Sequence, residues 1–239
     1  MATDDFNPEA WFSNFSQILS KRYEGDIAAI KSAGAKQSTV STVNPVRMAR
    51  QYLIEAYGAF SSGQPVKARQ LLSSAIVSAN SGAISPDAAE WAIDGPEIGR
   101  GHACMWGAIA RVFSHKQAEL FAYEDATLAD AWFGSATVIF LTNGEETMAG
   151  RSLQEWAESR RLYKDEEGAQ ILFLAALCLF MLTGNQTRME MAGKRTGESG
   201  PVAMESSFFL NRPASQAESK ILSSVLGASN SLAFYNSMS

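Results

Sequence analysis

Apolar side chains recur every three or four positions along most of this chain, the spacing that lines one face of an α-helix. Trp11, Phe15 and Leu19 show this spacing behind an Asn-Pro dipeptide that is typical of a helix start. Segments rich in Gly, Pro, Ser and Asn separate the apolar stripes and mark connections. The pattern predicts helices over residues 6–19, 46–60, 66–79, 87–93, 101–122, 127–141, 146–163, 169–182 and 214–226.

No segment alternates apolar and polar residues for long, so we predict an all-α fold. The expected architecture is a compact multi-helix bundle with terminal arms, and its helices could form two lobes. We divide the chain into an N-terminal arm or helix (1–26), a helical core (27–198) and a C-terminal helix and arm (199–239). Polar loops are predicted at residues 34–44 and 193–201.

Composition excludes several classes of protein. The chain has 239 residues, 46% of them hydrophobic and 19% charged, which is ordinary for a globular protein able to bury a core. Two cysteines exclude a disulfide scaffold. The longest apolar run, residues 171–182, is shorter than the about 20 residues that a membrane-spanning helix needs. With an acidic N-terminus unlike a secretory signal, we expect a cytoplasmic protein without a membrane partner.

Charge is distributed unevenly along the chain. The formal net charge is −5, yet residues 27–86 hold six basic groups against one acid, and residues 87–150 hold ten acids against three basic groups. Such asymmetry within one chain is a feature of proteins that contact nucleic acid on one side. Solvated helix faces would give the same charge runs, and the sequence does not distinguish the two interpretations.

The basic part also carries aromatic residues, and single-stranded nucleic acid binds to basic grooves in which bases stack on aromatic rings. A second basic cluster surrounds the glycine-rich loop near residue 194 and would close the groove from the other side. The predicted RNA-binding residues are Lys31, Lys36, Arg47, Arg50, Tyr52, Tyr57, Lys67, Arg69, Arg188, Lys194 and Arg195.

Both ends of the chain carry aromatic side chains that could dock on a neighbouring subunit. A basic patch on one copy can meet an acidic patch on the next, and head-to-tail contacts of this kind propagate into rings or filaments. The predicted oligomerisation residues are Phe6, Trp11, Phe12, Phe15, Phe234 and Tyr235.

No catalytic motif is present, so we expect a non-enzymatic protein without metal or cofactor. His102, Cys104 and His115 lie in one stretch, but the two histidines are too far apart on a helix to share an ion, and a fourth ligand is missing. Cys178 lies inside the apolar run and is interpreted as a core residue. An enzyme whose site surrounds the two histidines is the least favoured alternative.

Two resemblances follow from these patterns. One is to tetratricopeptide-like helix pairs, whose large, small and glycine positions match part of the chain at irregular intervals. The matching residues are Tyr52, Ala56, Gly63, Ala68, Leu72 and Ala75. This resemblance implies a protein–protein adapter, although any short helical hairpin needs small residues where its helices cross.

In general character the whole chain resembles the nucleocapsid and coat proteins of RNA viruses, which are helical and of similar size. No motif of those families is matched, so no residue roles are transferred. The resemblance implies sequence-independent sheathing of single-stranded RNA by a self-assembling protein, located in a host cytoplasm or virion.

Overall fold

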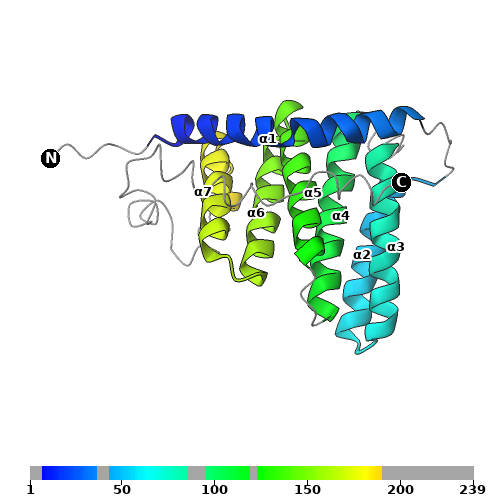
Figure 1. Ribbon diagram of the computed structural model, residues 1–239. Coiled ribbons are helices and arrows are strands. Elements are labelled where there is room, and N and C mark those ends of the chain that lie inside the picture. Colours follow the sequence, from blue (N-terminus) through cyan, green and yellow to red (C-terminus); the bar gives the residue numbers. More distant parts are fainter. Residues whose placement is uncertain (1–6, 37–42, 86–94, 119–122, 190–239) are drawn as a thin grey trace. The chain divides into compact units, whose positions relative to one another are not determined.

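The computed structural model describes residues 7–36, 43–85, 95–118 and 123–189 of the chain. Regular structure in these ranges is helical throughout and contains no strand, which confirms the all-α prediction. The long helices are α1 (Pro8–Lys36), α2 (Pro45–Ser61), α3 (Pro65–Ile84), α4 (Pro96–Ala118), α5 (Tyr123–Thr142), α6 (Glu146–Leu162) and α7 (Glu166–Leu182) (Figure 1).

Helix α1 is the largest departure from the predicted helix bounds. It continues to Lys36, although the pattern ended it at residue 19 and placed a loop from residue 34. The buried stripe continues through Tyr23 and Ile30, but one of its positions is Asp26, which is also buried. A polar residue at a core position interrupts the apolar periodicity on which the prediction depended.

Two further boundaries differ by one turn or slightly more. Helix α3 extends to Ile84 rather than residue 79, and α4 begins at Pro96 rather than residue 101. Proline is favoured in the first turn of a helix because its missing N–H would have no intrahelical partner there. The helices predicted over residues 87–93 and 214–226 lie outside the described residues.

The chain divides into two compact units, and the division falls within α1, after Arg22. One unit contains the second part of α1 and helices α2–α5, in which each of these helices packs on the next and α2 also contacts α4. The other contains the first part of α1 with α6 and α7, which pack on each other. Consecutive helices joined by short connections pack antiparallel.

The same turn follows four of the helices. In each turn, one residue has a positive φ, and the next residue donates its N–H to the carbonyl oxygen five positions earlier at 2.8–2.9 Å. This pattern satisfies the last carbonyl groups of the helix and reverses the chain within a few residues. The residues with positive φ are Gly63 after α2, Gly144 after α5, Lys164 after α6 and Gly184 after α7.

A buried arginine joins the middle of the larger unit. Arg111 of α4 donates hydrogen bonds to the Gly107 carbonyl oxygen at 3.3 Å and to Asn80 Oδ1 of α3 at 3.2 Å. Its guanidinium carbon lies 4.5 Å from the ring centroid of Trp132 on α5, which is completely buried. One side chain thus connects three successive helices.

Candidate nucleic-acid interface

The start of α2 places two arginines on the surface. Asn44 caps the helix, because its Oδ1 accepts hydrogen bonds from the backbone N–H groups of Val46 and Arg47 at 3.0 and 3.1 Å. Ala49 and Leu53 point into the core. The helical period therefore leaves Arg47 and Arg50 exposed to solvent.

Helix α3 repeats this arrangement. Pro65 begins the helix, Ala68 and Leu72 are buried, and Lys67 and Arg69 are exposed. Neither α2 nor α3 has an acid in its first turn, where a carboxylate would normally complement the positive end of the helix dipole. The cations at these two ends add to that positive potential instead.

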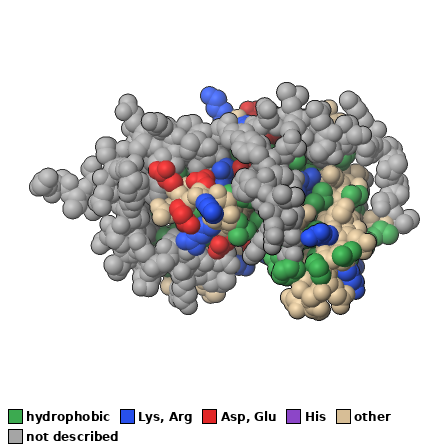
Figure 2. Space-filling view, turned by 60° about the horizontal axis from the view of Figure 1, so that its bottom comes forward, with side chains coloured by type: hydrophobic (Ala, Val, Ile, Leu, Met, Phe, Trp, Pro, Cys, Tyr) green, Lys and Arg blue, Asp and Glu red, His purple; other side chains and the backbone are tan. Residues whose placement is uncertain are grey.

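Glu55 is the single acid of residues 43–85, so four basic side chains give this α2–α3 hairpin a net charge of +3. Its Oε1 accepts a hydrogen bond from Gln51 Nε2 at 2.8 Å. In the part of Figure 2 where the hairpin lies, at the right, basic and hydrophobic side chains adjoin and no acidic side chain is visible. This surface, defined by Arg47, Arg50, Lys67 and Arg69, is called the hairpin face below.

An aromatic cluster adjoins the hairpin face. Tyr57 of α2 is 52% exposed and stacks on Phe113 of α4, with ring centroids 4.3 Å apart and ring planes 20° from parallel. Phe60 meets Phe113 edge to face at 5.9 Å. Because Phe113 is only 8% exposed, it supports the Tyr57 ring from the protein side.

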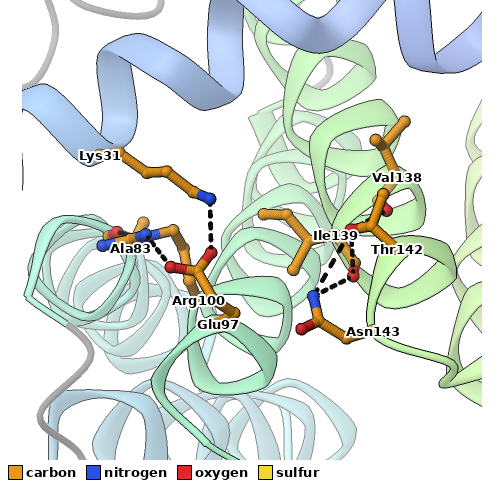
Figure 3. Close-up of polar contacts among 8 residues, drawn as sticks. All are labelled: Lys31, Ala83, Glu97, Arg100, Val138, Ile139, Thr142 and Asn143. Atoms are coloured by element: carbon orange, nitrogen blue, oxygen red, sulfur yellow. Dashed lines mark hydrogen bonds and ion pairs between the residues drawn. The ribbon is translucent and has the colours of Figure 1, made fainter.

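Lys31 has a different environment from the hairpin cations. Its Nζ lies 3.1 Å from Glu97 Oε2, and Glu97 also pairs with Arg100 at 3.0 Å (Figure 3). Arg100 in turn donates its Nε–H to the carbonyl oxygen of Ala83 at the end of α3. Lys31 therefore connects α1 to α4, and Glu97 offsets part of its charge.

The remaining predicted RNA-binding residues are not joined to the hairpin face. Tyr52 is half-buried, and Arg188 belongs to the unit that contains α6 and α7. The groove closed from its other side therefore stays a prediction. The side chain of Lys36, together with Lys194 and Arg195, lies outside the described residues.

Two of the predicted oligomerisation residues belong to the protein's own core. Phe12 and Phe15 are 7% and 1% exposed, so these rings do not form an exposed docking surface. Trp11 is half-buried and stacks on Phe15 with ring centroids 5.5 Å apart. The other members of that set, Phe6, Phe234 and Tyr235, lie outside the described residues.

The sequence analysis missed several residues at this surface. Phe60 and Phe113 were not singled out, and Phe113 gives no signal in sequence because its partner Tyr57 lies on another helix. Ile54, Val66 and Val77 are 56%, 68% and 63% exposed. Their signal was available, because each lies on the polar side of the helical period of α2 or α3.

The histidine and cysteine stretch is part of the core. His102 is buried and meets Phe140 edge to face at 5.1 Å. Among the described residues, no group of three His, Cys, Asp or Glu side chains could hold a metal ion. The side chain of His115 is not among those described.

Both thiols are stabilised in their neutral form. Burial raises the pKa of Cys104 to about 12, against a smaller opposing effect of the charges of Arg100 and Arg111. Burial likewise raises the pKa of Cys178 to about 12, with a smaller opposing effect from a backbone hydrogen bond. Neither thiol is therefore a reactive thiolate near neutral pH.

These raised pKa values predict a loss of stability at alkaline pH. Between the ordinary thiol pKa of 9.0 and about 12, the folded chain holds protons that the unfolded chain releases. The thiol contribution to stability is thus complete below pH 9.0 and declines as pH rises towards 12. Urea unfolding at pH values spanning this window measures it, and a Cys104→Ala, Cys178→Ala variant should show a shallower decline. An equal decline in both proteins would contradict the assignment.

No protein-family model, curated protein or solved structure matches this chain. In the described ranges, no helix combines the length and apolar character needed to cross a membrane. The functional interpretation therefore depends on the residues and geometry of the hairpin face.

Proposed function

We propose that this protein is a non-enzymatic, self-assembling protein that binds single-stranded RNA without sequence specificity, in the manner of a nucleocapsid or coat protein. The observation that carries the proposal is the hairpin face, on which Arg47, Arg50, Lys67 and Arg69 are exposed beside the supported ring of Tyr57. Arginine and lysine bind phosphate regardless of base sequence and release its counterions.

Tyr57 favours a single-stranded ligand over a duplex. A base in a duplex is stacked on its neighbours, whereas an unpaired base can stack on a protein ring, which stabilises the complex by about 1–3 kcal/mol per base. Phe113 covers one side of the Tyr57 ring, and the exposed part of that ring is available to a base. Of the two tyrosines predicted from sequence, Tyr57 is thus the better candidate.

A protein–protein adapter is the second candidate, and a specific observation favours it. Ile54, Val66 and Val77 are all more than half exposed on α2 and α3. Exposed apolar side chains that gather on one surface mark protein-binding sites. The regular pairing of successive helices is also compatible with an adapter built of helical hairpins.

Purification at moderate salt separates the two candidates. We expect a raised ratio of absorbance at 260 nm to that at 280 nm, which falls after nuclease treatment or a high-salt wash. Negative-stain micrographs of the same sample should show rings or filaments. A low ratio with small uniform particles, together with no binding of added oligouridylate, would exclude RNA sheathing and favour the adapter.

A further inference from the structure

Helices α2 and α3 carry the same short sequence. Residues 49–56 and 68–75 both read Ala-Arg-Gln-x-Leu-x-x-Ala, at an offset of 19 positions. In both copies the two alanines and the leucine are buried, and the arginine and glutamine are exposed. The two helices therefore bury equivalent faces and present equivalent Arg-Gln pairs to solvent.

The packing places these two pairs on one side of the hairpin. Two antiparallel helices that bury equivalent faces are related by an approximate two-fold axis perpendicular to their common plane. Rotation about this axis exchanges the helices but keeps the outward side outward. Arg50 lies 11 residues before the end of α2 and Arg69 four residues after the start of α3. At 1.5 Å per residue, they are separated by about 10 Å along the hairpin.

One difference distinguishes the two copies. Glu55 of α2 is replaced by Ser74 at the equivalent position of α3. Glu55 accepts the hydrogen bond from Gln51 and places a carboxylate beside that Arg-Gln pair. The α3 copy carries no charge at this position, so a polyanion meets less repulsion there.

We propose that the α2–α3 hairpin is a duplicated contact surface for one strand of RNA. Arg50 with Gln51, and Arg69 with Gln70, form two equivalent contacts, and Glu55 weakens the first of them. This inference rests on the proposed function. Arginine donates paired hydrogen bonds to phosphate oxygens. The adjacent glutamine amide offers both a donor and an acceptor to the strand.

Equilibrium binding of the full chain to fluorescein-labelled oligouridylate tests the inference. Fluorescence anisotropy would be measured between about 50 and 200 mM salt, because the slope of log K against log salt reports about 0.7 per phosphate contact on a single strand. The variants are Arg50→Gln, Arg69→Gln, the double variant and Glu55→Ser. Lys21→Gln removes one exposed cation outside the hairpin and is the matched control.

The two single arginine variants should behave alike. At about 0.1 M salt, loss of one contact weakens binding about five-fold relative to a 1 M reference and lowers the slope by about 0.7. The double variant should lose about 25-fold, since the two contacts are separate. Glu55→Ser should bind more tightly than the wild type, and Lys21→Gln should match the wild type. Far-UV circular dichroism verifies that each variant is folded.

Two results would overturn the duplication while leaving RNA binding intact. One is that a single arginine accounts for the whole loss. The other is that Glu55→Ser binds no more tightly than the wild type. Failure of the wild-type chain to bind oligouridylate would instead overturn the proposed function itself, and the duplicated surface with it.

Discussion

Replacement of Trp132 by alanine should lower the free energy of unfolding by about 3–5 kcal/mol, the range observed when a large aromatic side chain is removed from a core. Trp132 is completely buried, and its six-membered ring packs directly over the backbone of Gly107 on α4. A side chain at position 107 would collide with that ring, so the two helices approach closely only because glycine is there.

The loss should be large because Trp132 also covers a buried charge. The guanidinium group of Arg111 lies over its ring, and a desolvated contact of this kind contributes about 2 kcal/mol. Without the ring, Arg111 would face a cavity. Since whole domains are stable by only about 5–15 kcal/mol, the variant should lose a large fraction of its stability.

Urea unfolding followed by far-UV circular dichroism measures this effect. Trp132→Phe is the matched control, because phenylalanine keeps an aromatic face for Arg111 and leaves a smaller cavity. The phenylalanine variant should therefore be more stable than the alanine variant. An alanine variant within about 1 kcal/mol of the wild type would show that the α4–α5 contact is not packed as described.

Reversal of two charges on the hairpin face, Arg47→Glu with Arg50→Glu, should weaken RNA binding by at least about 25-fold at about 0.1 M salt. Two phosphate contacts are lost, and two new carboxylates repel the strand. Both side chains are exposed at the start of a capped helix, so the reversal leaves the buried face of α2 unchanged. Acids near a helix N-terminus also interact favourably with the helix dipole.

The salt dependence identifies the cause of any loss. We expect the slope of log K against log salt to fall by about 1.4, corresponding to two contacts on a single strand. Lys21→Glu with Lys164→Glu makes the same change in net charge at two exposed positions outside the hairpin. Equal losses in the two double variants would mean that total charge, rather than this surface, controls binding.

Much of the fold was predictable because helical periodicity is a local property. The bounds of α2, α6 and α7 agree with the structure to within about three residues, since each helix lies between a proline or acidic start and a turn. Helix α1 was predicted too short because its stripe includes the buried Asp26. A contact made from a distant segment can bury a polar residue, and local periodicity does not report such contacts.

The candidate site was predictable in its charges but not in its aromatic cluster. Arg47, Arg50, Lys67 and Arg69 are close together in sequence, so two adjacent helices bring them to one hairpin. The support of Tyr57 by Phe113 joins residues 56 positions apart. The ion pair between Lys31 and Glu97, likewise distant in sequence, explains why one predicted phosphate ligand has another partner.

The arrangement of the larger unit has a consequence for how the chain folds. Helices α2–α5 each pack on the next, so their contacts close short loops and form early. The second part of α1 is different, because Tyr23 packs against Gly134 of α5, more than 100 residues away along the chain. During synthesis this part of α1 emerges first, yet its partner on α5 emerges much later. The first helix to be made is therefore among the last to reach its final contacts.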